Sequence, residues 1–281
     1  MSKVLIASDS TCDLSQDLIQ RYGVHILPLG VSLGENQYTD GVDITPDDIY
    51  AHYAATGQLP KTSAVNIAQF DDFFREHTAD GSAIVLFTIS SDMSSTCSNA
   101  KIAAEEYENV YVVDTQNLST GGGLLVIAAA EMAAEGKSAK EIADSCTEMR
   151  DRIDASFLVD DLEFLHKGGR CSAVAALGAN LLQLKPCIVV KDGKMGVEKK
   201  YRGKFPAVLE KYISEKIGDG SNIDPNHVFV THGGCDQALM DHCVDLVKSA
   251  GNFKEVHLTR TGCTVSSHCG RNTLGVLFLR K

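Results

Sequence analysis

The stretch that decides the fold lies near the start of the chain and reads Val4-Leu5-Ile6-Ala7-Ser8-Asp9-Ser10-Thr11, with a helical pattern over residues 13–22. A short apolar run, a polar loop and a helix together form the repeating unit of an α/β sheet. The same order recurs over residues 83–106, and again over residues 110–134, where an Ala-rich helix starts at residue 124. These units predict a three-layer α/β/α domain whose parallel sheet has helices on both faces.

Residues 25–63, between the first two units, carry the signals of a hairpin and a loop. Residues 25–33 and 37–39 flank a turn of Gly, Glu and Asn, which favours a hairpin. Two further helices are expected, one capped by Thr45 and one by Asn66, with a loop over residues 56–63 between them.

The second half of the chain predicts a different sheet. Asp192-Gly193 is a strong signal for a two-residue turn, so we expect a hairpin there. Its strands and the later elements are predicted at residues 186–191, 194–200, 227–231, 255–260 and 274–279, with a helix over 237–250. We therefore expect a C-terminal α/β domain with a mixed sheet, and place the two domains at residues 1–155 and 156–281.

Composition and charge exclude several classes of protein. Hydrophobic residues make up 44% of the 281 residues and charged residues 22%, which is typical of a globular chain and disfavours disorder. The 26 basic and 37 acidic residues give a net charge of −11, which opposes binding to nucleic acid. The apolar runs before Ser8 and over residues 124–130 are too short for a signal peptide or a membrane span, so we expect a cytoplasmic protein.

The nine cysteines are an odd number without a C-x-x-C pair, which predicts free thiols in a reducing compartment. A zinc site in the C-terminal region is an alternative, but its spacings match no standard zinc pattern and we expect no metal. Its candidate ligands are Cys235, Cys243, Cys263, Cys269, His232, His242 and His268.

Hydroxyl side chains gather in the loops that follow the predicted strands. Loops at the carboxyl ends of parallel strands line one crevice, and hydroxyls beside helix N-termini suit a carboxylate or phosphate. For any single residue, capping of its own helix is the alternative interpretation. No nucleotide-binding fingerprint occurs, and the glycines at residues 121–123 and 168–169 fit tight turns or close packing as well as ligand contact.

An α/β enzyme acting on a small anionic substrate is the alternative function. His268 or His232 would be its acid or base, and Ser94 or Cys269 its nucleophile. No G-x-S-x-G motif supports it. A regulatory adaptor protein is a third interpretation.

Basic residues gather over residues 185–204. Seven Lys and Arg stand against Asp192 and Glu198 in this segment of an acidic protein. The segment could dock an acidic partner, or it could be a solvated hairpin whose lysines protect a sheet edge.

The order of several motifs along the whole chain resembles that of the DegV family of bacterial fatty-acid-binding proteins. They are the runs at residues 8–14, 61–63, 90–96, 113–115 and 165–170, and the tail at residues 268–275. The resemblance implies a two-domain α/β protein with a fatty acid such as palmitate, stearate or oleate in a tunnel between the domains. It also implies a carrier without catalytic activity or cofactor, which presents the carboxylate to a fatty acid kinase and allows a transient contact with a membrane surface.

Individual roles follow from the resemblance residue by residue. Thr62 and Ser94 look like the pair that binds the carboxylate, and Ser63, Arg170 and His268 match further ligand-binding positions. Arg202, with Lys200 and Lys204 beside it, is similar to the basic residue that meets the kinase, and so gives the basic segment a role.

The chain departs from the family pattern at three places. Ala64-Val65 stand where Gln-Pro is usual, and Ser95 stands where Gly is usual. Arg271-Asn272 replace Pro-Gly in the tail, so we expect a different turn after His268, and Arg271 could add a cation near the pocket.

Overall fold

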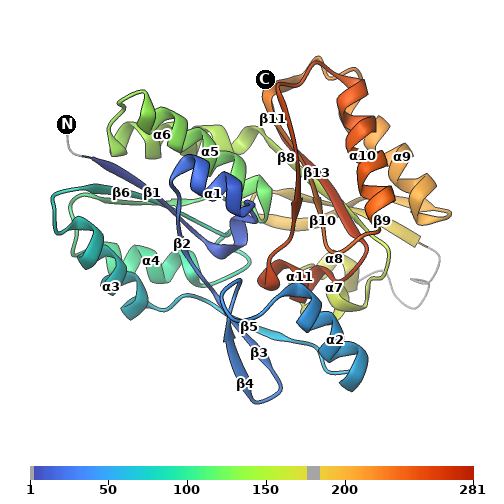
Figure 1. Cartoon of the computed structure of the whole chain (residues 1–281), viewed down its shortest axis with the longest axis horizontal. Helices are drawn as coiled ribbons and strands as arrows, with labels where there is room; N and C mark the ends of the chain where they lie inside the picture. Colours follow the sequence, from blue (N-terminus) through green and yellow to red (C-terminus); the bar gives the residue numbers. More distant parts are fainter. Residues whose placement is uncertain (1–2, 176–183) are drawn as a thin grey trace.

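A computed structural model describes residues 3–175 and 184–281 of the chain. These residues form a parallel four-stranded sheet, a mixed six-stranded sheet and an antiparallel three-stranded sheet (Figure 1). The predicted α/β fold, with a parallel sheet in the first half and a mixed sheet in the second, is confirmed.

The parallel sheet has the strand order β2-β1-β6-β7 and is covered on both faces. Its residues alternate, so that Leu5 and Ala7 pack toward one layer of helices while Ile6 packs toward the other. The predicted three layers are therefore present. The strands are β1 (Val4–Asp9), β2 (His25–Leu27), β6 (Ala83–Thr88) and β7 (Val110–Asp114), with α3 (Ile67–Thr78) and α4 (Thr96–Ala104) on one face and α5 (Thr120–Ala134) and α6 (Ala139–Met149) on the other.

The mixed sheet has the order β10-β9-β8-β13-β11-β12, and only β11 and β12 pair in parallel. Two helices cover its outer face (Figure 1). These elements are β8 (Ile153–Val159), β9 (Leu184–Lys191), β10 (Lys194–Arg202), β11 (Ile223–His232), β12 (Glu255–Arg260) and β13 (Thr273–Arg280), with α9 (Phe205–Ile217) and α10 (Gln237–Ala250).

Helix α5 lies between the two larger sheets and joins their cores. Eleven of its 15 residues are buried, as expected for a helix that is apolar on all sides. It packs against β1 and β6 on one side and against β8, β11 and β13 on the other, so one hydrophobic cluster runs from Phe87 through Leu125 to Phe157. The chain enters the second sheet at Ile153, and we propose that the domain boundary lies there, close to the predicted residue 155.

Two predictions about the region of the small sheet are wrong. This sheet consists of β4 (Asn36–Thr39), β3 (Gly30–Leu33) and β5 (Lys61–Ser63), and α2 (Pro46–Thr56) lies beside it (Figure 1). The predicted first hairpin strand is wrong over His25–Leu27, which pairs with β1 instead, because Pro28 interrupts the run. The predicted loop is wrong over Lys61–Ser63, which pairs with β3; no local signal marks a three-residue strand whose partner is distant.

Two helix starts also differ from prediction. Asp13 has a φ of +49° and ends a short 3-10 turn, so the first helix begins at Gln16 rather than Asp13. Helix α5 begins at Thr120 rather than residue 124, because its glycines permit close packing: a Cβ at Gly123 would lie 2.8 Å from the Cys12 carbonyl oxygen. The remaining elements are η1 (Ser10–Cys12), α1 (Gln16–Tyr22), η2 (Arg150–Arg152), α7 (Glu163–Gly168), α8 (Ser172–Ala175) and α11 (Cys263–Cys269).

Two further findings concern the thiol groups of the cysteines and the length of the helices. All nine cysteines are free and buried. Within residues 3–175 and 184–281, no helix combines the length and the apolar character that crossing a membrane requires.

Candidate ligand-binding cavity

A cavity of about 270 Å³ lies between the two halves of the chain. On one side it is lined by β5 and by the loops after β6 and β7, and on the other by α11, β10 and the loop after α7. The cavity thus lies at the carboxyl ends of the parallel strands, where open α/β sheets bind ligands. Apolar side chains form much of its wall, namely Leu29, Ile89, Met93, Leu118, Met195 and Val265.

The structure brings together all five residues that the sequence assigns to ligand binding. They are Thr62, Ser63, Ser94, Arg170 and His268. Thr62 and Ser63 lie on β5, Ser94 lies in the loop between β6 and α4, and His268 lies on α11. Residues up to 206 positions apart therefore meet at one site.

Thr62, Ser94 and His268 form the polar part of the cavity. Thr62 Oγ1 and His268 Nε2 are joined by a hydrogen bond of 2.9 Å. Ser94 Oγ accepts a hydrogen bond of 3.2 Å from the backbone N–H of Thr96 and lies 2.9 Å from Thr96 Oγ1. Hydroxyl and imidazole groups can donate to a carboxylate or another anion.

The imidazole of His268 is uncharged at neutral pH. Burial, and to a smaller extent the nearby Arg170 guanidinium, lowers its pKa to about 4. Arg170 is exposed and is the only Lys or Arg among the residues that line the cavity in the described part of the chain. The cavity therefore offers mainly neutral hydrogen-bond donors.

Gly168 fixes the position of the His268 ring. A Cβ at Gly168 would lie 2.8 Å from His268 Nδ1, which is closer than real contacts allow. His268 Nδ1 is buried and has no hydrogen-bond partner within the described residues. Gly169 has a φ of +72° and ends α7. In this glycine pair, Gly168 therefore permits close packing and Gly169 forms the tight turn.

Two buried aspartates of the first half hold the first turn of α11. Asp13 Oδ1 accepts a hydrogen bond of 2.7 Å from the backbone N–H of Gly262, and Asp40 Oδ1 accepts one of 2.7 Å from that of Cys263. Asp40 Oδ2 accepts further hydrogen bonds from the backbone N–H and the hydroxyl of Thr264, at 3.1 and 2.6 Å. These hydrogen bonds satisfy the free N–H groups at the start of α11, and because α11 carries His268, they help to position the imidazole.

Sequence reasoning missed the roles of these aspartates and of Gly168. Asp13 lies in the polar loop after β1, and its place there could have indicated its role. Asp40 bonds to residues 223 and 224 positions away, so no local pattern could indicate it.

Several other loop hydroxyls serve the protein's own structure, but by contacts other than the capping of their own helices that the alternative interpretation held. Thr11 Oγ1 donates to Asp9 Oδ1, and Thr115 Oγ1 donates to the Thr88 carbonyl at 2.8 Å. Ser90 Oγ donates to the carbonyl of Gly193 at 2.7 Å and so ties the loop after β6 to the turn of the β9–β10 hairpin. These contacts stiffen the cavity wall.

The residues named for an enzyme do not form a nucleophile–base pair in the described structure. Ser94 makes no hydrogen bond to a histidine, and His268 bonds to Thr62 instead. Burial raises the pKa of the Cys269 thiol to about 12, which opposes a thiolate. His232 lines a different cavity, beside Arg260, and burial lowers its pKa to about 4.

The cysteines and histidines considered for zinc do not converge. Among residues 3–175 and 184–281, the one group of three metal-binding side chains with ligand atoms within 4.8 Å of one another is His227, Glu255 and His257. This group lies outside the cavity and includes none of the candidate zinc ligands.

The basic residues lie on a separate surface. Lys200 and Arg202 are on β10, an edge strand of the mixed sheet, and Lys204 caps α9. All three are exposed and make no ion pair with any described residue. Met195, on the same strand, lines the cavity. Arg202 lies seven positions further along the strand, which places the two residues roughly 23 Å apart.

The structure shows where Arg271 and Asn272, the tail residues that differ from the family pattern, lie. The Arg271 guanidinium stacks 5.0 Å from the Tyr50 ring centre and lies 3.5 Å from Asp47, outside the cavity. The expectation of a cation from Arg271 near the pocket is therefore wrong. Asn272 has a φ of +53°, which Asn tolerates better than most residues.

Comparison with known proteins places this fold and cavity in a family. The family model described as "Uncharacterised protein, DegV family" matches residues 3–281. The chain belongs to the DegV family. A DegV domain-containing protein of Clostridium acetobutylicum is 32% identical over the whole of both chains.

Two solved structures agree with this fold. A fatty-acid-binding DegV family protein from Thermus thermophilus superposes with a TM-score of 0.90 at 29% identity, covering 99% of this chain and 100% of that one. A stearic acid-binding protein from Eubacterium ventriosum superposes with a TM-score of 0.84 at 29% identity, covering 100% and 99%. The resemblance read from the motifs is confirmed.

Proposed function

We propose that this DegV protein binds one long-chain fatty acid and holds its carboxylate at Thr62, Ser94 and His268. The observation that carries the proposal is the convergence of neutral hydrogen-bond donors with an apolar wall in one cavity. The relatives from Thermus and Eubacterium, described as binding fatty acids, support it.

The head group would be oriented by hydrogen bonds rather than held by a tight ion pair. His268 is neutral at pH 7, so it contributes one N–H donor beside the hydroxyls of Thr62 and Ser94. Ser63 and the exposed Arg170 line the same cavity and add further polar groups. Ion pairs with Arg are shorter and stronger than neutral contacts, so this arrangement suits a carrier that must later release its ligand.

The acyl chain would supply most of the affinity. Burying a methylene contributes about 0.8 kcal/mol, so the roughly 14 methylenes of palmitate give about 11 kcal/mol before ordering costs. Leu118, Val265 and Cys269 line both the cavity and a second small cavity of about 20 Å³, which continues toward Phe157 and Leu277. We propose that the acyl chain follows this direction, into the space between the two larger sheets.

Organic extraction of the purified protein, followed by mass spectrometry, tests the proposal. We expect one fatty acid per chain after incubation with a mixture of fatty acids. Leu118→Trp should shift the retained acids toward shorter chains, because the indole would fill the junction of the two cavities. Absence of any extracted fatty acid from the folded wild-type protein would contradict the proposal.

We further propose that the protein performs no catalysis itself and presents the carboxylate to a cytoplasmic fatty acid kinase. The exposed residues Lys200, Arg202 and Lys204 would bind an acidic surface of the kinase, and their distance from the cavity separates docking from ligand binding.

Charge reversal tests the docking surface. Arg202→Glu should weaken acyl phosphorylation by the kinase while fatty acid affinity stays unchanged. Lys248→Glu, an exposed lysine on α10, is the matched control and should leave both unchanged. Equal loss of phosphorylation in both variants would count against a specific docking surface.

A further inference from the structure

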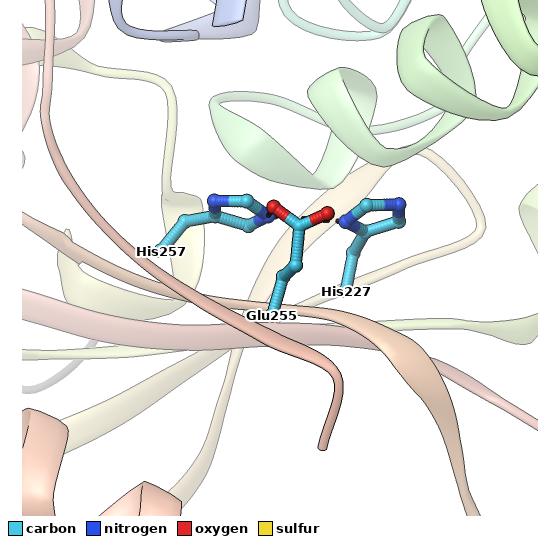
Figure 2. Close-up of side chains that lie close together, drawn as sticks. All are labelled: His227, Glu255 and His257. Atoms are coloured by element: carbon cyan, nitrogen blue, oxygen red, sulfur yellow. Dashed lines mark hydrogen bonds and ion pairs between the residues drawn. The ribbon is translucent and has the colours of Figure 1, made fainter.

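A cluster of two histidines and a carboxylate lies outside the ligand-binding cavity, where the middle of β11 runs beside the first half of β12. His227 pairs with Glu255 across these parallel strands, and His257 follows two residues later on the same face. Figure 2 shows the three side chains turned toward one another. Their ligand atoms lie within 4.8 Å of each other, so they can share one small ligand.

The hydrogen bonds of the cluster fix the position of each proton. His227 Nε2 lies 3.1 Å from Glu131 Oε1 on α5, and since a carboxylate only accepts, Nε2 carries the proton. His227 Nδ1 therefore presents a lone pair, and it lies 3.0 Å from His257 Nε2. When both rings are neutral, a single proton, on His257 Nε2, lies between them.

The spacing of these two nitrogens suits a metal ion. Two nitrogens that bind one tetrahedral zinc ion at about 2.0–2.1 Å are about 3.3 Å apart, which is close to the observed 3.0 Å. To bind an ion, His257 must move its proton to Nδ1, and both rings must turn so that their lone pairs meet at the ion. The Glu255 carboxylate, 3.8 Å from His257 Nε2, supplies a third ligand.

We propose that His227 Nδ1, His257 Nε2 and the Glu255 carboxylate bind a divalent transition-metal ion, with zinc as the best match to two imidazoles and one carboxylate. Glu131 acts as the outer partner that orients His227, as carboxylates commonly do for metal-binding histidines. The two histidine side chains are 10% and 12% exposed and Glu255 is 32% exposed, so solvent reaches the site along the carboxylate.

Arg21 on α1 competes with a bound metal ion for the Glu255 carboxylate. Its guanidinium makes two hydrogen bonds of 2.7 Å to the two Glu255 oxygens. A bound ion must share the carboxylate with this cation, which weakens binding. The site thus joins ligands from the mixed sheet to Arg21 and Glu131 from the first half of the chain.

Titration of chelator-treated full-length protein with Zn²⁺ by calorimetry tests the proposal. We expect saturable binding of one ion per chain. His227→Ala and His257→Ala should each weaken it by more than about 100-fold, which exceeds the cost of losing an outer partner. Glu131→Gln should weaken it by about 10-fold, and Arg21→Gln should tighten it because it frees Glu255.

Two controls separate this site from adventitious binding. His77→Ala removes the other close histidine pair, His25 and His77, whose ring centres are 5.0 Å apart, and should leave Zn²⁺ affinity unchanged. Substitution with Co²⁺ should give visible absorption without thiolate charge transfer. Wild-type affinity in folded His257→Ala protein, a thiolate band, or no saturable binding by the wild type would overturn the proposal.

Discussion

The molecule has two histidine sites, one in the cavity and one on β11 and β12, and their surroundings are opposite. In the cavity, α11 holds His268 against the Thr62 hydroxyl, with Arg170 nearby. On β11 and β12, His227 and His257 lie beside the carboxylates of Glu131 and Glu255.

The difference shows how neighbours decide what a histidine can bind. His268 is desolvated and has a cation nearby, so it stays neutral and suits an anionic ligand. The other pair has carboxylates within reach, so a cation is the favoured ligand there. Since the two sites share no residue, changes at one should leave the other intact.

The largest effect is expected from Asp40→Ala, which removes the anchor of α11. Three donors of Cys263 and Thr264 and the hydroxyl of Ser10 would lose their acceptor. We expect a loss on the order of 3 kcal/mol in the free energy of unfolding, measured by urea denaturation, because buried unpaired donors cost about 1–3 kcal/mol each. Fatty acid affinity should fall as well, while Zn²⁺ affinity should not.

Asp43→Ala is the matched control for this change. Asp43 Oδ1 accepts one hydrogen bond from the backbone of Thr39 at an exposed position. Its loss should cost less than about 1 kcal/mol. Equal destabilisation by both variants would contradict the anchoring role of Asp40.

A smaller effect is expected from the ionisation of Asp13, which makes the free energy of unfolding depend on pH. Burial raises the pKa of Asp13 to about 8, while hydrogen bonds from Ser119 and Gly262 lower it and the charges of Asp40 and Asp9 raise it. In the unfolded chain this carboxyl ionises near its ordinary value of 3.8. Between about pH 4 and pH 8 the unfolded state therefore binds fewer protons, so this group makes stability fall as pH rises.

Asp13→Asn should remove that contribution. Asn can accept the Gly262 N–H and tolerates the φ of +49° at this position. We expect the wild type to lose on the order of 2 kcal/mol more than the variant between pH 5 and pH 8, measured by urea denaturation at each pH. Parallel pH profiles for the two proteins would show that Asp13 does not titrate in this range.

The smallest effect is expected from Gly168→Ala. The added Cβ would meet His268 Nδ1 at 2.8 Å, so the imidazole must shift away from Gly168, which disturbs its hydrogen bond to Thr62. Fatty acid affinity should fall about tenfold, or about 1.4 kcal/mol, measured by equilibrium binding. Gly196→Ala on β10, where a Cβ meets no atom within 4 Å, should have no effect. An unchanged affinity in Gly168→Ala would mean that the ring position does not matter.

The sequence predicts those parts of the fold whose signals are local. The apolar run before Ser8 and the turn at Asp192-Gly193 each predict an element that the structure contains. Residues 61–63 are too few to show a strand pattern, and their pairing with β3 depends on contacts distant in the chain. The apolar run in α5 could have indicated a helix buried on all sides, but not which two sheets cover it.

The candidate site was predictable through the family motifs rather than through spacing. Thr62 and His268 stand 206 positions apart, and only the resemblance connected them before the structure did. The supporting roles of Gly168 and Asp40 depend on interatomic distances, which a single sequence does not contain. The pairing of His227 with Glu255 likewise requires the register of two parallel strands.

The central claim is that a fatty acid carboxylate lies at Thr62, Ser94 and His268. The most direct test is the carboxyl NMR resonance of bound palmitate labelled with carbon-13 at that carbon. We predict a resonance distinct from free palmitate that shifts in Thr62→Val and in Ser94→Ala and stays in place in Arg202→Glu. A bound resonance that is identical in the wild type and in both hydroxyl variants would contradict the claim.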